Sequence, residues 1–462
     1  DAGISTDEIF DVSPYAHNLF EYFLRQPFGQ ELGRKFKISV SGSENDNAFS
    51  FMHDVGLIAK IKDGVKGFKV MVGGGLGAQP RLAECAYEFL PANEIVPFIE
   101  SCVRLFDRYG ERANRAKARL KYLIAQWGIE GLKEKIEEIK LSLTNQTHEL
   151  TEDVPRAYSG PNENYQIAPE TSIEDQAAYE LWYKTNVKNQ KQEGFKSLYI
   201  RLTSGDFYTD EARILADLVD AYAGDDIRIG INQGLQLRYI KPESLPYVYS
   251  VLKSINMVKP GFNSTMDITA CPGTTTCNLG ISDSTNTAIE MEKFMAIKHP
   301  DLVNNEEIKI KISGCMNSCG QHSLAQIGFH GSSTKEKATK KVLPALQVLL
   351  GGGVTKDGGG RISEKVIKIP SKRALLGLDL ILNEYKVNKT EGEGFNQYYD
   401  RTGKMHFYDL LKPLANTTNL EDTDFIDWGT DENYLKTIGK GECAGVVIDL
   451  VATLLMDVEE KM

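Results

Sequence analysis

An internal repeat sets the architecture expected of this 462-residue chain. Residues Lys37–Asn47 and Lys309–Cys319 share the pattern Lys-Ile-x-x-Ser-Gly-x-x-Asn, and further on Asp54-Val-Gly stands opposite Gln326-Ile-Gly. Each copy later contains an apolar stretch that ends in three glycines, at Val70–Gly75 and Val348–Gly353. The pattern in each copy predicts a strand, a polar loop, a second strand and then an apolar strand. We therefore predict two degenerate copies of one module, of which only the second carries closely spaced cysteines.

The stretches around the two copies complete the predicted organisation. Residues 94–140 are predicted to be helical, with an apolar stripe formed by Ile95, Ile99, Cys102, Val103 and Phe106. From residue 173 to 257, helices alternate with strands at Ser197–Leu202 and Ile227–Gln233, which is typical of half of a ferredoxin-like fold. The fold class is therefore α+β, with duplicated modules of mixed sheet and helices plus a ferredoxin-like half-domain. The predicted boundaries are a first module over 1–140, a linker over 141–172, the half-domain over 173–257, a second module over 258–415 and a tail with a helix over 416–462. Since only the second module is preceded by such a half-domain, we expect this chain to be a fragment whose other half-domain lies upstream of Asp1.

Charge and hydropathy exclude two classes of partner. The formal charge of −11 argues against nucleic acid, which needs a basic surface. The longest apolar run, Ala444–Met456, has 13 residues and contains Asp449, so we interpret it as a packed helix rather than a membrane span. Seven cysteines are too few for a secreted disulfide scaffold of this length. We expect a cytoplasmic protein with neither nucleic acid nor a membrane as its partner.

Four of the seven cysteines fall in two close pairs, Cys271 with Cys277 and Cys315 with Cys319. The spacings are C-x5-C and C-x3-C, separated by 37 residues, whereas structural zinc sites usually have C-x2–4-C pairs in both halves. Four thiolates can hold a [4Fe–4S] cube with one cysteine per iron, and amides of the intervening Gly-Thr-Thr-Thr turn can donate hydrogen bonds to its sulfurs. The pattern favours a [4Fe–4S] cluster, with buried core cysteines and zinc as the alternatives. The remaining cysteines are interpreted as core or helix-packing thiols: Cys85 and Cys102 at apolar helical positions, and Cys443.

The cysteine pairs, the Ser-Gly-Cys-Met-Asn-Ser-Cys-Gly-Gln stretch and the repeated Gly-Gly-Gly strands resemble the sulfite and nitrite reductase family over roughly residues 1–415. The resemblance implies sirohaem coupled to a [4Fe–4S] cluster, and it implies that these cofactors reduce sulfite to sulfide, or nitrite to ammonia, with six electrons. It also implies that Cys271, Cys277, Cys315 and Cys319 bind the cluster, and that Cys319 bridges to the sirohaem iron. In the family, the substrate-binding arginines and part of the sirohaem cradle come from the region before Asp1. The chain has no Gly-x-Gly-x-x-Gly turn between a strand and a helix, so we expect electrons from a partner such as ferredoxin or a flavoprotein.

Basic residues at the start of the first module are the candidate substrate site. Strand alternation places Lys35 and Lys37 on one side and Phe36 on the other, and two converging ammonium groups favour an anion between them and can donate protons. A solvated basic strand end is the alternative. The resemblance makes both lysines catalytic, and the family's sulfite reductases have lysine at the position of Lys37 where nitrite reductases more often have asparagine. Sulfite reduction is therefore the predicted function, and the alternatives are nitrite reduction and a non-catalytic Fe–S electron-relay or structural subunit.

Contacts to sirohaem also follow from the resemblance. Arg34 is predicted to pair with one of the eight sirohaem carboxylates, a task that suits a planar guanidinium. Arg119 and Lys121 are predicted to pair with others, from a basic run that we interpret as helical, with a solvated helix face as the alternative. The amides predicted to contact the macrocycle are those of Asn232, Gln233 and Asn317. His322 is interpreted as a surface histidine or, alternatively, as a proton donor. Ser43 and Asn47 replace Cys315 and Cys319 in the first copy, so we expect no second cluster there.

Overall fold

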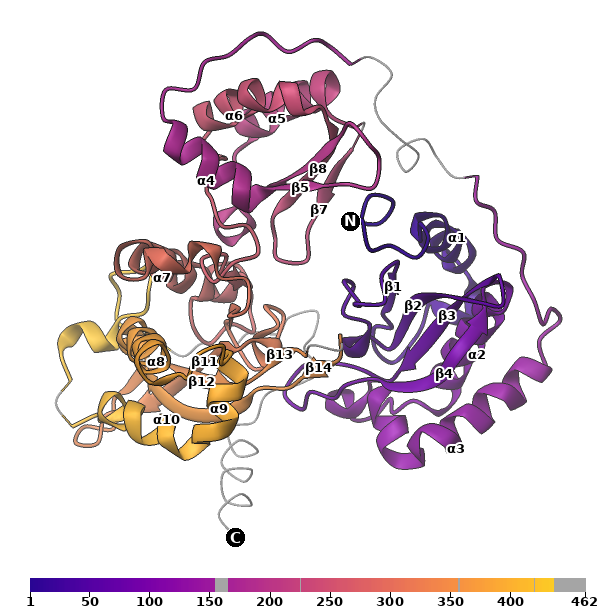
Figure 1. Ribbon diagram of the computed structural model, residues 1–462. Coiled ribbons are helices and arrows are strands. Elements are labelled where there is room, and N and C mark those ends of the chain that lie inside the picture. The colour runs from indigo at the N-terminus through magenta and orange to yellow at the C-terminus, as the bar shows by residue number, and fades with distance from the viewer. Residues whose placement is uncertain (154–164, 225, 356–357, 419, 436–462) are drawn as a thin grey trace.

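The computed structural model of the chain describes residues 1–153, 165–224, 226–355, 358–418 and 420–435 (Figure 1). The described residues form two modules built on sheets and a smaller α/β unit that lies between them in the sequence. No helix among these residues is long and apolar enough to cross a membrane. The predicted tail helix Ala444–Met456 and Cys443 lie outside the described residues.

The first module contains a four-stranded sheet with the order β1-β2-β3-β4. The β1–β2 pair is parallel and the other pairs are antiparallel. The strands are β1 (Ile38–Ser41), β2 (Val55–Lys62), β3 (Val65–Val72) and β4 (Glu84–Pro91). The helices of the module are α1 (Ser13–Phe23), α2 (Ile95–Tyr109) and α3 (Lys121–Leu141).

Two sequence predictions for the first module have different outcomes. The apolar stripe on α2 is confirmed, because its five residues are all buried: Ile95, Ile99, Cys102, Val103 and Phe106. The helical position predicted for Cys85 is wrong. Cys85 lies on β4, where side chains alternate between the two faces, and its half-buried thiol donates a hydrogen bond to Glu88 Oε1 at 3.3 Å.

The second module contains a five-stranded sheet with the order β15-β12-β11-β10-β9. Its strands are β9 (Thr269–Ala270), β10 (Ile310–Ser313), β11 (Ile327–Lys335), β12 (Val342–Leu350) and β15 (Glu364–Pro370). Its helices are α7 (Ser284–Lys298), α8 (Ala374–Asn388), α9 (Phe395–Thr402) and α10 (Lys404–Leu411). Strand β10 is parallel to both of its neighbours, and the remaining pairs are antiparallel. The predicted mixed sheets are therefore present in both modules.

Equivalent hydrogen bonds confirm that the two modules are copies of one fold. The amide of Val55 donates to the carbonyl of Lys37 at 3.1 Å, and the amide of Ile327 donates to the carbonyl of Lys309 at 3.1 Å. In each copy the polar residue just before the second strand accepts the amide of the repeated lysine. Asp54 Oδ2 accepts from Lys37 at 2.9 Å, and Gln326 Oε1 accepts from Lys309 at 2.9 Å.

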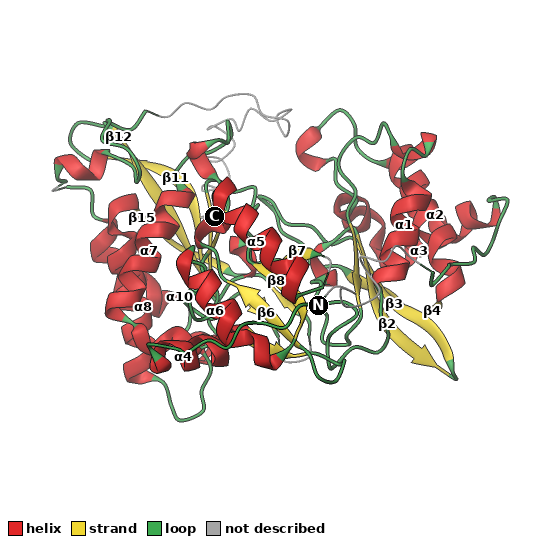
Figure 2. Cartoon of the chain, turned by 90° about the horizontal axis from the view of Figure 1, so that it is seen from above, coloured by secondary structure: helices red, strands yellow, loops and turns green. Residues whose placement is uncertain are grey.

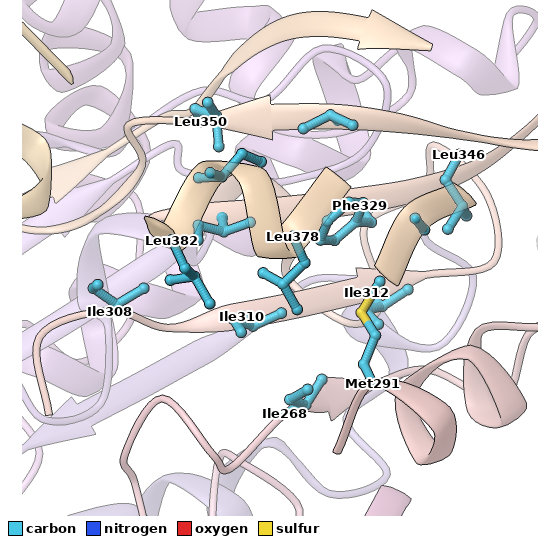
Figure 3. Packing of buried hydrophobic residues seen from close by; sticks show 14 of the residues in the cluster. Ile268, Met291, Ile308, Ile310, Ile312, Phe329, Leu346, Leu350, Leu378 and Leu382 are labelled. Atoms are coloured by element: carbon cyan, nitrogen blue, oxygen red, sulfur yellow. The ribbon is translucent and has the colours of Figure 1, made fainter. Parts of the chain in front are cut away.

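The core of the second module lies between its sheet and helices α7 and α8 (Figure 3). Ile310 and Ile312 on β10 and Phe329 on β11 are almost completely buried. They belong to one cluster with Met291 of α7 and Leu378 of α8. Burial of side chains of this size contributes roughly 1.5–3 kcal/mol each, so this core fixes β9 and β10 at the site described below.

The α/β unit between the modules has an antiparallel sheet with the order β5-β6-β8-β7. Its strands are β5 (Val187–Asn189), β6 (Lys196–Ile200), β7 (Ile227–Ile229) and β8 (Leu235–Ile240), and its helices are α4 (Gln176–Asn186), α5 (Thr209–Tyr222) and α6 (Leu245–Ser254). Helices α5 and α6 lie on the face of the sheet away from the two modules (Figures 1 and 2). The single strand predicted at Ile227–Gln233 is wrong in extent, because a turn at residues 230–234 separates β7 from β8.

The two modules meet through a small apolar cluster. Phe51 and Met52 of the first module and Leu324 of the second are buried together, with Leu76 and Leu82 packed against them. The glycine-rich turns after β3 and β12 take part in this seam. Gly360, on the hairpin of β13 (Gly353–Val354) and β14 (Gly360–Arg361), leaves no room for a Cβ atom because the Phe51 ring would lie 2.3 Å from it. Glycine at position 360 therefore allows close contact between the copies.

Candidate functional site

Two parallel strands deliver the predicted cluster cysteines to one edge of the second sheet. Strand β9 ends at Ala270, directly before Cys271, and β10 ends at Ser313, two residues before Cys315. Because β9 and β10 are parallel neighbours, the loops that follow them start side by side. The amide of Cys271 donates to the carbonyl of Ile312 at 3.2 Å, which joins the two loops at their base.

The four thiols of the two loops lie close enough to act on one another electrostatically. Burial raises the pKa of Cys315 to about 12, the amide of Asn317 lowers it, and Cys271, Cys319 and Cys277 raise it. Cys315 is buried and Cys271 is half-buried, whereas Cys277 and Cys319 are exposed. The thiols therefore form a partly open group at the module edge.

Backbone amides of the second loop point at two of the sulfurs. The amide of Gly314 donates to Cys271 Sγ at 3.1 Å, and that of Asn317 donates to Cys315 Sγ. A Cβ atom on Gly314 would lie 2.5 Å from the Cα atom of Gly273, so glycine at both positions lets the loops meet. Among the described residues, no group of three His, Cys, Asp or Glu side chains is arranged to hold a single metal ion. Four thiols with amide donors to their sulfurs fit a [4Fe–4S] cluster, where each thiolate binds a different iron.

The predicted substrate lysines face this cysteine group from the other module. Phe36 packs in the core with its ring 6.0 Å from that of Phe106, while Lys35 and Lys37 are exposed on the opposite side. Although the Lys37 side chain as a whole is exposed, desolvation around its ammonium group lowers its pKa, and the charges of Lys35 and Arg119 lower it further. Asp54 and Cys319 raise this pKa. The structure therefore brings Lys37 within electrostatic range of Cys319, although Cys319 follows it by 282 positions. Arg34 lies just before this group and is half-buried.

Arg119 forms a buried ion pair with Asp54. Its Nη2 lies 2.7 Å from Asp54 Oδ2 and its Nε lies 3.2 Å from Oδ1. The side chain of Asp54 is 0% exposed and that of Arg119 is 13% exposed. Burial raises the pKa of Asp54, and the Arg119 guanidinium and the Lys37 amide act in the opposite direction. Asp54 thus holds both Arg119 and the backbone of Lys37, a role that its position in the repeat had not indicated.

Lys121 occupies a different environment from the one predicted. Its Nζ donates to the carbonyls of Leu76 at 2.9 Å and of Gln79 at 2.5 Å, and lies 3.4 Å from that of Gly75. Burial lowers its pKa to about 8. The helical run predicted from Arg115 to Lys121 is wrong, because residues 115–117 form a separate 3₁₀ turn and α3 begins at Lys121. Contact of Arg119 or Lys121 with sirohaem stays a prediction.

The predicted amides of the half-domain bind the segment that leads into Cys271. Gln233 Nε2 donates to the carbonyl of Ala270 at 2.7 Å, and the amide of Ala270 donates to Gln233 Oε1 at 2.9 Å. Asn232 Nδ2 donates to Asp267 Oδ2 at 2.5 Å. Asp267 is buried and burial raises its pKa to about 6, with Arg201 acting in the opposite direction. A macrocycle contact by either amide stays a prediction.

His322 is buried, so its interpretation as a surface histidine is wrong. Its side chain is 3% exposed, and its ring centroid lies 4.9 Å from that of His330. Burial lowers the pKa of His322 well below its ordinary value, and His330 lowers it further. A histidine in this environment is neutral at pH 7 and does not carry an acidic proton there. Asn317 is half-buried, and its macrocycle contact stays a prediction.

Comparison with known proteins places these features in a family. The family model described as the nitrite and sulphite reductase 4Fe-4S domain matches residues 1–143 and 261–416, and the nitrite/sulfite reductase ferredoxin-like half domain matches residues 188–255. The chain is 27% identical over 399 residues to sulfite reductase [ferredoxin] 1 of Mycolicibacterium paratuberculosis, covering 85% of this chain and 66% of that protein. It is 25% identical over 408 residues to the chloroplastic ferredoxin–nitrite reductase of Arabidopsis thaliana, covering 85% of this chain and 64% of that protein.

The NirA protein of Mycobacterium tuberculosis has a similar structure, with a TM-score of 0.72 and 25% identity over 88% of this chain and 70% of that chain. The chain thus spans about two thirds of the length of the curated relatives it matches. The two matched module segments coincide with the two copies of the repeat, and the cysteine loops lie in the second of them. The chain belongs to the nitrite and sulphite reductase family, whose cofactors are sirohaem and a [4Fe–4S] cluster.

Proposed function

We propose that the chain is the catalytic part of a reductase that converts sulfite to sulfide with six electrons. The observation that carries this proposal is the position of Lys37, whose ammonium group lies within electrostatic range of both Lys35 and Cys319. Two ammonium groups beside a cluster ligand provide positive charge where an oxyanion must be held. When bound, sirohaem with its coupled cluster supplies the electrons and an open coordination position on iron.

The lysines bind the anion and supply protons as its oxygens leave as water. Repulsion between the two ammonium groups is relieved when an anion lies between them, so each lysine favours substrate binding by the other. The depressed pKa of Lys37 makes its ammonium a stronger acid than a lysine surrounded by water alone, which suits a general acid at neutral pH. Arg119 contributes a further positive charge close by, and Asp54 keeps that charge in place.

The cluster ligands in this proposal are Cys271, Cys277, Cys315 and Cys319. The amides of Gly314 and Asn317 donate to sulfur and so stabilise thiolate charge without adding another titratable group. Ferredoxin is the proposed electron donor, since the relatives named above are ferredoxin-dependent by name.

Lys37 is the residue that favours sulfite over nitrite. Relatives with either name match at similar identity, so overall similarity does not choose between the two anions. A fully ionised sulfite carries two negative charges and nitrite carries one, so a second ammonium benefits sulfite more. Nitrite reduction to ammonia is the second candidate, and it is supported by the nitrite reductases among the relatives.

The test is anaerobic turnover with reduced methyl viologen on the cofactor-loaded protein, with sulfite and nitrite measured in parallel. We expect kcat/KM to be higher for sulfite, and we expect K37N to lower it at least tenfold for sulfite while nitrite turnover falls less. K62N is the matched control, because Lys62 is an exposed lysine at the far end of β2. Nitrite preference that K37N leaves unchanged would contradict the assignment. A cluster spectrum without the red absorption of sirohaem would instead support an electron-relay subunit.

A further inference from the structure

The turn between β7 and β8 reaches from the half-domain to the segment that carries Cys271. This turn spans residues 230–234 and is closed by two backbone bonds, from the amide of Gly230 to the carbonyl of Gly234 at 2.7 Å and from the amide of Gln233 to the carbonyl of Gly230 at 3.1 Å. Gln233 has a φ of 72°, a left-handed conformation that is uncommon for a residue with a side chain. Such a conformation is strained for a residue with a side chain, so the contacts of the turn must hold it.

The Gln233 side chain takes the place of a neighbouring strand along the open side of β9. Strand β9 has only two residues and is the edge strand of its sheet, so one side of Ala270 has no neighbouring strand. Gln233 fills this position with its carboxamide, which accepts the Ala270 amide at 2.9 Å and donates to the Ala270 carbonyl at 2.7 Å. This reciprocal pair satisfies two backbone groups that would otherwise need water.

Asn232 provides a second point of attachment three residues upstream. Its Nδ2 donates to Asp267 Oδ2 at 2.5 Å, and the same oxygen accepts the amide of Asn263 at 2.7 Å. Both Asn232 and Asp267 are buried. The turn therefore holds the segment between Asp267 and Ala270 at both of its ends.

We propose that Gln233 is a positioning residue for Cys271, and that through it the half-domain sets the geometry of the first cluster ligand. Cys271 follows Ala270 directly, and its sulfur accepts the Gly314 amide at 3.1 Å. Displacement of Ala270 would displace the sulfur from this donor. The carboxamide of Gln233 thus binds the backbone of Ala270. This inference rests on Cys271 as a cluster ligand and is independent of which anion the enzyme reduces.

The first test uses the cluster-free chain and measures hydrogen exchange of the Ala270 amide. Q233M keeps the length of the side chain and removes both hydrogen bonds, so we expect exchange to accelerate about tenfold or more. Q233E keeps an acceptor for the Ala270 amide but loses the donor to its carbonyl, so we expect a smaller acceleration. Q236M is the matched control, because Gln236 is a buried glutamine of β8 that donates to the Tyr199 hydroxyl at 2.6 Å, within the same half-domain.

The second test measures the midpoint potential of the cluster in the loaded protein. A hydrogen bond from a backbone amide to a cysteine sulfur stabilises the more negative, reduced cluster. Weakening the hydrogen bond from Gly314 to Cys271 should therefore lower the midpoint potential in Q233M. We expect Q236M to leave the potential unchanged. The proposal would be overturned if Q233M kept the wild-type exchange rate of the Ala270 amide or the wild-type midpoint potential of the cluster. It would also be overturned if Q233M and Q236M changed these two quantities equally. The proposed function is tested separately by K37N, because Lys37 takes no part in the contacts between Gln233 and Ala270.

Discussion

Asp54 holds two groups of the site through three hydrogen bonds, and replacing it by asparagine tests whether this buried carboxylate organises the first module. It accepts two hydrogen bonds from the Arg119 guanidinium and one from the Lys37 amide. Its side chain is fully buried, so water cannot replace these partners. D54N keeps the shape of the side chain and removes its charge, which leaves Arg119 without its counter-ion.

The expected cost follows from the burial of the pair. Removing one partner of a buried ion pair typically costs 3–5 kcal/mol, because the remaining charge is left without compensation. Asparagine can still accept the Lys37 amide through its carbonyl oxygen, and Arg119 is 13% exposed, so we expect the lower end, about 3 kcal/mol. This corresponds to an increase in the opening equilibrium of roughly a hundredfold.

The assay is native-state hydrogen exchange of the Val55 amide, which donates to the carbonyl of Lys37 and reports on β1–β2 pairing. Local exchange avoids assuming that the whole chain unfolds in one step. E138Q is the control, because Glu138 belongs to an exposed ion pair with Lys135 on α3, and we expect it to leave Val55 exchange unchanged. An acceleration below about fivefold in D54N would refute the reasoning, since it would mean that the pair contributes about 1 kcal/mol or less.

Two further predictions concern the pH dependence of stability in the cluster-free chain, measured as the free energy of unfolding in urea. The pKa of Asp267 is about 6 in the folded chain against an ordinary 3.8, so the folded state binds the proton more tightly and stability should fall by about 3 kcal/mol as pH rises from 4 to 6. D267N should reduce this fall, and an identical pH profile would contradict the prediction. The pKa of Lys121 is about 8 against an ordinary 10.5, so the unfolded state binds more protons in that interval and stability should rise with pH between 8 and 10. K121M should reduce this rise in the free energy of unfolding. An unchanged slope between pH 8 and 10 would contradict the burial of the Lys121 ammonium group.

The sequence allowed the modules and the cysteine group to be predicted because their signals are local. The repeat predicts strands of the same length at the same positions in both copies, and parallel strands end at the same edge of a sheet. Cys315 follows such a strand by two residues, whereas the short strand β9 before Cys271 lies outside the repeat, and Cys271 was assigned to the group from its C-x5-C spacing. The alternation of side chains along a strand likewise predicted that Phe36 points to one side and the two lysines beside it to the other.

The partners of the basic residues could not be predicted, since they depend on contacts between distant parts of the chain. Asp54 and Arg119 are 65 positions apart, and Lys121 binds carbonyls more than 40 positions away. A run of basic residues does not reveal whether it faces a ligand, a carboxylate or backbone carbonyls. The burial of His322 could not be predicted for a related reason, because it packs against His330 of β11, eight positions further along the chain.

The turn at Gln233 carried no local signal for its left-handed residue. Glycine or asparagine is the usual choice at such a position, and the neighbours Asn232 and Gly234 would both suit it better. The observed choice is explained only by the contact with Ala270, which needs the longer carboxamide at that point. A local departure from turn preferences therefore identifies a tertiary constraint.

The two copies keep the same backbone in the cysteine loop while their side chains serve different purposes. Positive φ angles recur at Asp46 and Ser318, 53° and 59°, and again at Phe49 and Gln321, 52° and 59°. At the position of Cys315 the first copy has Ser43, whose hydroxyl donates to Asp7 Oδ2 at 2.6 Å. The first copy instead contributes Lys37, whereas its counterpart Lys309 donates its Nζ to the carbonyl of Asn263. Because the two loops meet across one seam, a single duplicated scaffold can place thiols on one side of the site and ammonium groups on the other.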